Sequence, residues 1–271
     1  MGERVYDEIP YRPWGLEHRY GDGVFILAEP VLLTYLARLC APATVQPKVN
    51  DLVEVCYRGL LERVFSSELP RVRVMQDTRM IQSSPEGRYC GQITDPQTRV
   101  VTVNIARAGT FPSHICFDLL NHLLDPAGVR QDHVIMDRVT DAKGRVTGAG
   151  IHGTKVGGSV EGCYLLFPDP MGATGSSLIR AIRHYKDSVE GVPRRIIAVH
   201  LIVTPEYLRA MRSAHPEVVI YAIRLDRGLS PPAVLESVPG THWEQEVGLN
   251  EHQYIVPGGG GFGEILNNSY V

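Results

Sequence analysis

Hydrophobic residues along this chain follow two alternating patterns, short continuous runs and longer stretches in which they recur every three or four positions. The short runs, typical of buried strands, lie at residues 100–105, 134–138, 164–167, 195–203 and 217–223. The periodic stretches, typical of amphipathic helices, lie at residues 31–39, 49–65, 112–124, 178–189 and 205–214. Strands that alternate with helices indicate a parallel sheet covered on both faces. We therefore predict an α/β fold with a central, mostly parallel sheet.

The remaining segments predict how the chain is divided. Residues 1–23 are rich in charge, aromatic rings, glycine and proline, and we expect them to form an extended N-terminal arm. Residues 70–98 show a mixed pattern that indicates short strands. The many glycines among threonine and valine at residues 139–160 indicate a hairpin or a flap. Because the remainder contains no linker-like stretch, we expect residues 24–271 to form a single domain.

Composition limits the partners and the compartment. The 271 residues carry a net charge of -3 and 44% hydrophobic residues, so the chain has no general attraction to nucleic acid or to an anionic membrane. No apolar run approaches the roughly 18 residues of a membrane span, and the charged N-terminus shows no signal peptide. The five cysteines form no C-x-x-C pair, which favours free thiols in a reducing cytoplasm. We expect a cytoplasmic protein with no nucleic-acid or membrane partner.

The ten histidines do not predict a metal site. They are scattered, and neither H-x-x-x-H nor H-E-x-x-H spacing occurs. We therefore expect the histidines to have structural or surface roles and no metal to be held by protein side chains.

One segment carries the clearest sign of chemistry. The apolar run at 164–167 ends at Asp169, turns through small residues 172–177 and leads into the helix predicted from Leu178. In a parallel sheet such a turn lies at the carboxyl end of a strand, where ligands collect. The free N–H groups and the dipole of the helix favour an anion, and the carboxylate can bind sugar hydroxyls. This segment predicts a phosphorylated sugar, whereas the lack of G-x-G-x-x-G and of G-x-x-x-x-G-K-[ST] argues against a dinucleotide or a nucleoside triphosphate.

Four segments in order resemble one family. The string Asp-Pro-Met-Gly-Ala-Thr-Gly-Ser at 169–176 is similar to the phosphoribosyl-pyrophosphate (PRPP) motif D-P-M-x-A-T-G-G-S of uracil phosphoribosyltransferases. Asn-Ile-Ala-Arg-Ala-Gly at 104–109 resembles the family's P-I-L-R-A-G. Segments 205–221 and 248–258 look like its A-P-E … A-H-P-D-V-x-x-Y and G-L-N-E-x-G-Y-I-x-P-G. The resemblance covers most of residues 24–266 and implies a type I phosphoribosyltransferase fold, with a flap hairpin and a small hood from the C-terminal segment.

The resemblance implies roles for the matched residues. Asp169 would bind the ribose hydroxyls and stabilise positive charge at the anomeric carbon, with Arg107 as the second catalytic residue. The 5′-phosphate and the ribose would be bound by Asp169, Met171, Ala173, Thr174, Gly175, Ser176 and Ser177. The pyrophosphate would be bound by Arg107, Ala108, Gly109, Arg138 and Lys155. The cofactor Mg²⁺ would be held mainly through the pyrophosphate.

The chain departs from the family in the loop that would bind the base. The resemblance implies a base-binding loop at 254–266 whose contact residues are Tyr254, Ile255, Gly260, Gly261, Phe262, Gly263 and Glu264. Gly261 stands where the family has Asp or Asn, Glu264 replaces a second Asp, and Ile265 replaces an Arg. A site built on hydrogen bonds discriminates steeply between bases, so a changed polar partner can change the substrate. An insertion at 230–247 precedes this loop.

The implied reaction is that of uracil with PRPP to give UMP and pyrophosphate, a step of pyrimidine salvage. Such a displacement passes through an oxocarbenium-like state and needs positioning and charge support rather than a covalent nucleophile. No Ser, Cys or His stands in a nucleophile motif, which agrees with that chemistry. Two alternatives stay open, namely transfer to a different base and a non-catalytic homologue that senses a nucleotide or PRPP. The resemblance also implies a homodimer.

Overall fold

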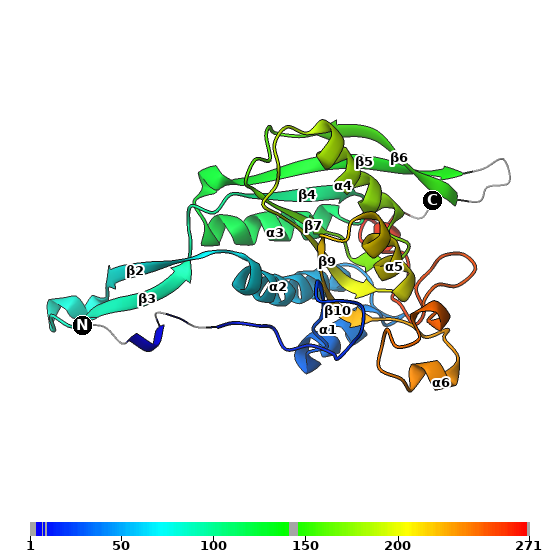
Figure 1. The fold of residues 1–271 in the computed structure, drawn as a ribbon, viewed down its shortest axis with the longest axis horizontal. Coiled ribbons are helices and arrows are strands. Elements are labelled where there is room, and N and C mark those ends of the chain that lie inside the picture. The colour runs from blue at the N-terminus through cyan, green and yellow to red at the C-terminus, as the bar shows by residue number, and fades with distance from the viewer. Residues whose placement is uncertain (1–3, 7, 9, 141–145, 270–271) are drawn as a thin grey trace.

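The computed structural model, which describes residues 4–6, 8, 10–140 and 146–269, is built around one large sheet (Figure 1). Within these residues the sheet has 8 strands in the order β1-β10-β9-β7-β4-β5-β6, and β8 pairs with β9 beside this path. The strands are β1 (Val24–Ile26), β4 (Val100–Ala106), β5 (Val129–Thr140), β6 (Val146–Lys155), β7 (Tyr164–Pro168), β8 (Met171–Gly172), β9 (Arg195–Val203) and β10 (Val219–Leu225). Neighbouring strands are parallel except β6, which runs antiparallel to β5. The predicted mostly parallel sheet is confirmed.

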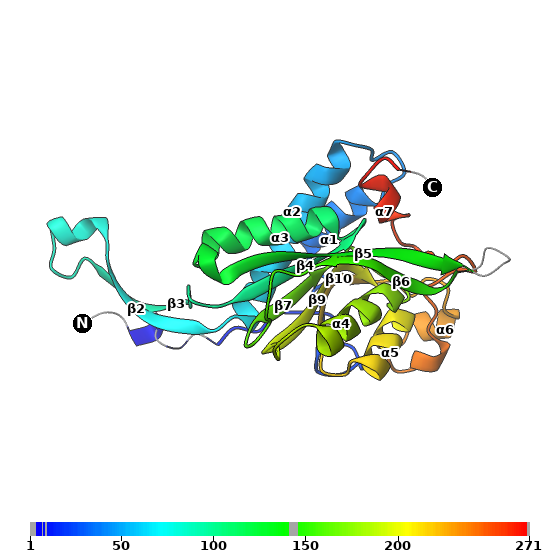
Figure 2. The same ribbon diagram turned by 90° about the horizontal axis from the view of Figure 1, so that it is seen from above.

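Helices cover both faces of this sheet (Figure 2). One face carries α1 (Pro30–Leu39), α2 (Lys48–Glu68) and α3 (Thr110–Leu123), and the other carries α4 (Ser176–Ser188) and α5 (Pro205–Ala214). Strand β9 packs against both layers, because Val199 and Leu201 are buried in the core beneath α2, whereas Ala198 and Val203 are buried in the core beneath α4 and α5. Such near-continuous burial is expected of a parallel strand with helices on both sides.

Most elements lie where the hydrophobic pattern predicts them. β9 and α5 have the predicted bounds. Helix α4 begins at Ser176 rather than Leu178 because its first turn is made of small polar residues, which the apolar periodicity does not register. The predicted flap is the β5–β6 hairpin, which pairs from His133 with Lys155 to Thr140 with Val146.

A separate hairpin projects from the body of the molecule (Figures 1 and 2). Its strands β2 (Arg71–Asp77) and β3 (Arg88–Thr94) form a two-stranded antiparallel sheet, and the short helix η2 (Arg79–Gln82) lies at the tip. The N-terminal turn η1 (Arg4–Tyr6) packs against β3, with the rings of Tyr6 and Tyr89 6.3 Å apart. Met75 and Met80 of this hairpin are 71% and 58% exposed.

The insertion at 230–247 is ordered around a buried acid. It contains α6 (Pro232–Leu235) and η4 (Trp243–Gln245). The carboxylate of Glu246 accepts hydrogen bonds from Arg227 (2.9 Å) and from the Gly240 N–H (2.8 Å). The Trp243 ring packs edge-on against Tyr20, 5.0 Å away, and its Nε1–H donates to the Pro205 carbonyl at 3.0 Å. The insertion therefore ties the N-terminal arm to the start of α5.

No helix among the described residues is long and apolar enough to cross a membrane. All five cysteines are free, and Cys56, Cys116 and Cys163 are buried. Burial raises the pKa of Cys56 and of Cys116 to about 12, so both are protonated thiols at neutral pH.

Candidate functional site

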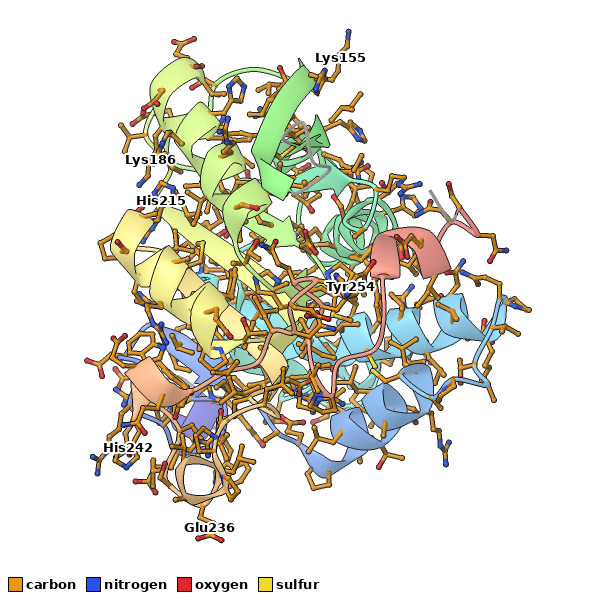
Figure 3. All side chains as sticks on the ribbon, turned by 90° about the vertical axis from the view of Figure 1, so that its right-hand side faces the viewer. Lys155, Lys186, His215, Glu236, His242 and Tyr254 are labelled. Atoms are coloured by element: carbon orange, nitrogen blue, oxygen red, sulfur yellow. The ribbon has the colours of Figure 1, made fainter. Side chains whose placement is uncertain are left out.

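The carboxyl ends of three neighbouring parallel strands meet at one edge of the sheet. β4 ends at Ala106, β7 at Pro168 and β9 at Val203, and these strands pair in the order β4-β7-β9. The segments that begin at Arg107 and Asp169 follow β4 and β7 directly, so the fold brings both to the edge where open α/β sheets bind ligands. Figure 3 views the molecule from this side, with Tyr254 near the centre.

Asp169 is held in place by the neighbouring strand β9 and by the turn that follows it. Its backbone N–H donates to the Val199 carbonyl of β9 at 3.0 Å, and its carboxylate Oδ1 accepts the Met171 N–H at 3.2 Å. Burial raises the pKa of Asp169 from 3.8 to about 6, and the hydrogen bond from Met171 offsets only part of that rise. At neutral pH the carboxylate is therefore ionised in a poorly solvated place, where hydroxyl groups or a cation of a ligand would stabilise it.

The turn after Asp169 presents donors to an anion. Gly175, the residue before α4, has a φ of +81°, a left-handed conformation that glycine adopts without strain. The Ser176 N–H donates to the Thr174 hydroxyl at 3.4 Å, and the Thr174 and Ser176 hydroxyls lie 3.2 Å apart. Gly175 has no side chain that could cap α4, and the first turn of this helix contains no acid. The helix therefore begins as a site for a phosphate group.

Residues at the start of α5 bind this turn through hydrogen bonds and packing. The Thr204 hydroxyl donates to the Ala173 carbonyl at 2.7 Å, and the Thr204 N–H donates to the Gly172 carbonyl at 3.0 Å. A Cβ on Gly172 would lie 2.9 Å from the Val203 side chain and 3.0 Å from the Tyr207 ring, so glycine favours this close approach of the loop to α5. Thr204 and Tyr207 are residues that the sequence analysis missed. The available signal was a Thr-Pro at the start of a predicted helix, which is typical of a cap.

The loop after β4 carries an accessible guanidinium. The peptide bond between Ala106 and Arg107 is cis, and the Gly109 N–H donates to the Ile105 carbonyl at 3.0 Å where α3 begins. The Arg107 side chain is exposed, and its Nη1 donates to the Ser269 hydroxyl at 2.7 Å. The C-terminal segment therefore contacts the residue that was predicted to bind pyrophosphate.

The predicted base-binding loop abuts the Arg107 loop. Strand β10 leads to Asp226, whose carboxylate pairs with Arg224 at 2.6 and 2.7 Å and accepts the Gly258 N–H at 2.8 Å. Arg224 also donates to the Gly258 carbonyl at 3.0 Å. Beyond this clamp, helix α7 (Phe262–Ile265) brings Gly263 next to Ala108, since a Cβ on Gly263 would lie 3.9 Å from the Ala108 Cβ. The two loops thus border the same edge.

The change at Gly261 has a structural counterpart within the loop. The Glu264 carboxylate folds back over Gly261, and a Cβ on Gly261 would lie 3.0 Å from the Glu264 carboxyl carbon. The acid at 264 therefore occupies the space next to the position where a side chain is missing.

Of the two remaining predicted pyrophosphate residues, Lys155 stands apart from these loops. Lys155 is in register with His133, which is in register with Asn104, so Lys155 flanks the body of the sheet rather than its carboxyl edge. Its exposed side chain points outward in Figure 3. Arg138 lies on β5 beyond the level of Ala106, but its side chain is outside the part of the chain that the structure describes.

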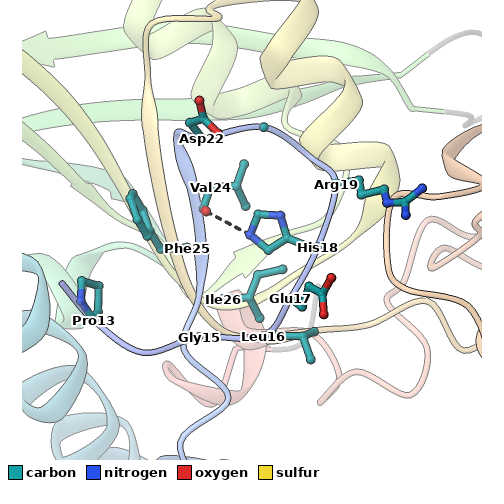
Figure 4. Close-up of a pocket in the computed structure, with 11 residues that line it drawn as sticks. Pro13, Gly15, Leu16, Glu17, His18, Arg19, Asp22, Val24, Phe25 and Ile26 are labelled. Atoms are coloured by element: carbon teal, nitrogen blue, oxygen red, sulfur yellow. Dashed lines mark hydrogen bonds between the residues drawn. The ribbon is translucent and has the colours of Figure 1, made fainter.

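A cavity of about 500 Å³ lies away from this edge, in the N-terminal arm (Figure 4). It is lined by residues between Pro13 and Ile26, and within it the His18 Nε2–H donates to the Val24 carbonyl at 3.0 Å. Burial lowers the pKa of His18, which keeps its ring neutral at physiological pH. None of the predicted site residues is among those that line the cavity.

Comparison with known proteins points to one family. The family model described as uracil phosphoribosyltransferase matches residues 26–242. The chain is 30% identical over 214 residues to the uracil phosphoribosyltransferase of Variovorax paradoxus, an alignment that covers 78% of this chain and 85% of that protein. It is 32% identical over 177 residues to the one of Rhodococcus jostii, covering 65% of this chain and 68% of that protein. The family match ends within the insertion, so the predicted base-binding loop lies beyond it.

A solved structure supports the fold over nearly the whole chain. The AQ2163 protein from Aquifex aeolicus superposes with a TM-score of 0.68 at 19% identity, covering 92% of this chain and 99% of that one. At this identity the similarity shows the fold alone.

Proposed function

Because the chain belongs to the uracil phosphoribosyltransferase family, we propose that it transfers the phosphoribosyl group of PRPP to uracil, giving UMP and pyrophosphate. The observation that carries this proposal is the meeting of three segments at one edge of the sheet. The Asp169 turn offers a phosphate and ribose site, the Arg107 loop offers a cation, and the loop held by Asp226 lies against Ala108.

The residues of this edge suit a displacement at the anomeric carbon. In the reaction the bond from C1′ to the pyrophosphate oxygen breaks, and a bond from C1′ to a uracil nitrogen forms. The proton of that nitrogen passes to water or to the released pyrophosphate. The first turn of α4 and the hydroxyls of Thr174, Ser176 and Ser177 bind the 5′-phosphate and fix the ribose. The Asp169 carboxylate binds the ribose hydroxyls and stabilises the positive charge that develops on the sugar ring.

The leaving pyrophosphate binds at the Arg107, Ala108 and Gly109 loop. The Arg107 Nη1 donates to the Ser269 hydroxyl, and the guanidinium has further N–H groups that can bind a pyrophosphate oxygen. Arg138 remains a candidate for the same group because β5 extends past the carboxyl edge, whereas Lys155 is the weakest of the predicted contacts.

The site also fits Mg²⁺ held through the substrate. Asp169 is a half-buried carboxylate with a raised pKa, which is the kind of group that a nearby cation stabilises. The described residues contain no group of three or more metal-binding side chains, and Mg²⁺ in phosphate sites is typically bound by one or two carboxylates, water and the phosphates themselves. When bound with PRPP, Mg²⁺ would neutralise charge on the pyrophosphate as it departs.

We also propose that the protein is a cytoplasmic homodimer, with the β2–β3 hairpin as its contact arm. An isolated two-stranded hairpin is marginally stable in water. This hairpin exposes apolar side chains along its length, including Met75, Met80 and Ile93. A second copy of the chain would cover these side chains and stabilise the arm.

A nucleobase panel tests the reaction. Pyrophosphate release from PRPP with Mg²⁺ is measured with uracil, cytosine, hypoxanthine and adenine as acceptors. We expect uracil to give the highest kcat/KM and UMP as the nucleotide product. Turnover of another base with none of uracil would refute the assignment of uracil. Binding of PRPP without turnover of any base would favour a sensing homologue. The changes at Gly261 and Glu264 are the reason to test that alternative.

A further inference from the structure

Two buried polar side chains, His200 of β9 and Tyr207 of α5, lie beneath the turn at 169–177. Each is 1% exposed. The His200 Nδ1 lies 2.6 Å from the Asp169 carbonyl oxygen, and its Nε2 lies 2.6 Å from the Tyr207 hydroxyl. The two rings meet edge to face, with centroids 4.7 Å apart. Every other residue of β9 after Arg195 is apolar, so this histidine interrupts a strand that is otherwise hydrophobic.

The partners determine where the imidazole carries its proton. A carbonyl oxygen can only accept, so the Nδ1–H of His200 donates to Asp169, and the Nε2 accepts the Tyr207 O–H. Burial lowers the pKa of His200 to about 4, which keeps the ring neutral and this direction of hydrogen bonding constant at physiological pH. The pair thus forms one directed chain from the Tyr207 hydroxyl to the Asp169 backbone.

Tyr207 also contacts the part of the turn that lies before α4. A Cβ on Gly172 would lie 3.0 Å from its ring, and one on Gly175 would lie 3.2 Å from it. The Tyr207 N–H donates to the Thr204 hydroxyl at 3.0 Å, and that hydroxyl donates to the Ala173 carbonyl. Tyr207 is therefore linked through His200 to Asp169, at the ribose end of the turn. Its ring also packs against the glycines at the phosphate end.

We propose that His200 and Tyr207 are positioning residues, which set the orientation of the Asp169 carboxylate relative to the 5′-phosphate site at the start of α4. The inference rests on the proposed function, because it assigns the pair to the ribose 5-phosphate half of that site. Neither side chain reaches the ligand, and their effect passes through the Asp169 carbonyl and the glycines of the turn. A displacement of about 1 Å at a reacting group can cost on the order of a hundredfold in rate, so a rigid support beneath Asp169 has a direct consequence for turnover.

Two substitutions of His200 separate its two hydrogen bonds. The amide nitrogen in His200→Asn takes the place of Nδ1 and can still donate to the Asp169 carbonyl. The amide in His200→Gln takes the place of Nε2, so it keeps the Tyr207 contact and loses the bond to Asp169. Tyr207→Phe keeps the ring beneath Gly172 and Gly175 but removes the hydroxyl that holds the imidazole.

Tyr185→Phe is the matched control. Tyr185 is a buried tyrosine of the same core, and its hydroxyl donates to the Asp132 carboxylate at 2.9 Å, away from the turn. Its loss should lower the melting temperature about as much as Tyr207→Phe does, since each leaves a buried acceptor without its donor.

Affinity for ribose 5-phosphate, measured by calorimetry, and kcat/KM for PRPP are the readouts, with thermal melts for all variants. We expect His200→Gln, which loses the bond to Asp169, to weaken both readouts about tenfold or more, since about 1.4 kcal/mol is tenfold. His200→Asn and Tyr207→Phe each keep a donor to the Asp169 carbonyl and lose only the bond between residues 200 and 207, so both should stay within about threefold of the wild type. Tyr185→Phe should change stability alone.

Three results would overturn the inference. One is an equal loss in His200→Asn and His200→Gln. Another is a loss of affinity that follows the melting temperature across all variants, Tyr185→Phe included. The third is a wild-type protein that does not bind ribose 5-phosphate. A wild-type protein that binds ribose 5-phosphate but makes no UMP would refute the transferase proposal, and the order of the variants in calorimetry would still decide the role of the pair.

Discussion

Asp169 is a carboxylate whose ionisation the fold makes costly. Its pKa is raised from 3.8 to about 6 by burial, and the single hydrogen bond from Met171 does not compensate for the lost water. Replacing this acid with a neutral residue would remove that cost and raise the free energy of unfolding. We infer that the cost is retained because a charged group is needed where positive charge develops on the substrate.

This cost predicts a pH-dependent difference in stability between the wild type and Asp169→Asn. The unfolded chain ionises near 3.8 and the folded one near 6, so the unfavourable contribution grows as pH rises from about 4 to about 6 and is fully present above. At about pH 8 it amounts to at most about 3 kcal/mol, and about 1 kcal/mol moves the melting temperature by about 2–4 °C. Calorimetric melts of the ligand-free proteins should show Asp169→Asn several degrees more stable at about pH 8, with the difference vanishing below about pH 4. A difference independent of pH would contradict the raised pKa.

At the residue scale, the sequence predicts the shape of segments made of consecutive residues. It does not predict contacts between residues that are far apart in the chain. Asp169 to Ser177 is one continuous strand-turn-helix, so its shape follows from its own residues. The bonds of His200 to Asp169 and of Ser269 to Arg107 join residues far apart in the chain, and no spacing rule reveals them. The assignments of the individual site residues remain predictions.

The predicted base-binding loop depends on an ion pair between Arg224 and Asp226 at the end of β10. Asp226 is 2% exposed and binds both Arg224 and the Gly258 N–H, while Arg224 binds the Gly258 carbonyl. A planar guanidinium can make these bonds at once, whereas an ammonium cannot. This clamp, rather than the glycines alone, holds the start of the loop in place.

Arg224→Lys should therefore raise KM for uracil about tenfold, because a charge-assisted bond to the loop is lost. Affinity for ribose 5-phosphate should be unchanged, since that site lies on other elements. Steady-state kinetics with each substrate varied in turn, together with calorimetry, measure both. The matched control is Arg130→Lys, which alters a similar pair with Asp132 (2.9 Å) near the opposite, amino-terminal edge of β5. Equal effects of the two substitutions on KM for uracil would contradict the role of the clamp.

At the element scale, the hydrophobic pattern predicts the bounds of those helices and strands that bury apolar side chains. β9 and α5 have their predicted bounds because apolar runs and a Thr-Pro start define them locally. The long β2–β3 hairpin was expected only as short strands, because its side chains are mostly exposed and leave no clear alternation. The hydrophobic pattern could not predict the position of Lys155 along the sheet, because the strand register of the β5–β6 hairpin shifts at two places.

At the scale of the whole molecule, the projecting hairpin is the feature that a single copy leaves exposed. Met75→Glu should disrupt the proposed homodimer, because a charge buried in an apolar contact costs far more than one in water. Val192→Glu is the control, since Val192 is 72% exposed and Met75 is 71% exposed. Analytical ultracentrifugation should show a dimer for the wild type and the control, and a monomer for Met75→Glu. Identical sedimentation of all three would exclude Met75 from the contact.

The insertion, the N-terminal arm and the C-terminal segment modify the common fold without disturbing its sheet. The insertion binds the arm and the start of α5, and the C-terminal segment binds Arg107. The departures of this sequence from the family motifs lie in the predicted base-binding loop, at Gly261, Glu264 and Ile265.

Formation of UMP from uracil and PRPP with Mg²⁺, followed for the wild type and Asp169→Asn side by side, tests the central claim most directly. We expect the wild type to release UMP and pyrophosphate in equal amounts. Asp169→Asn should bind ribose 5-phosphate with the fold intact and turn over on the order of a hundredfold or more slowly, since it loses a charge that supports the transition state. Wild-type rates in Asp169→Asn, or no UMP from either protein, would contradict it.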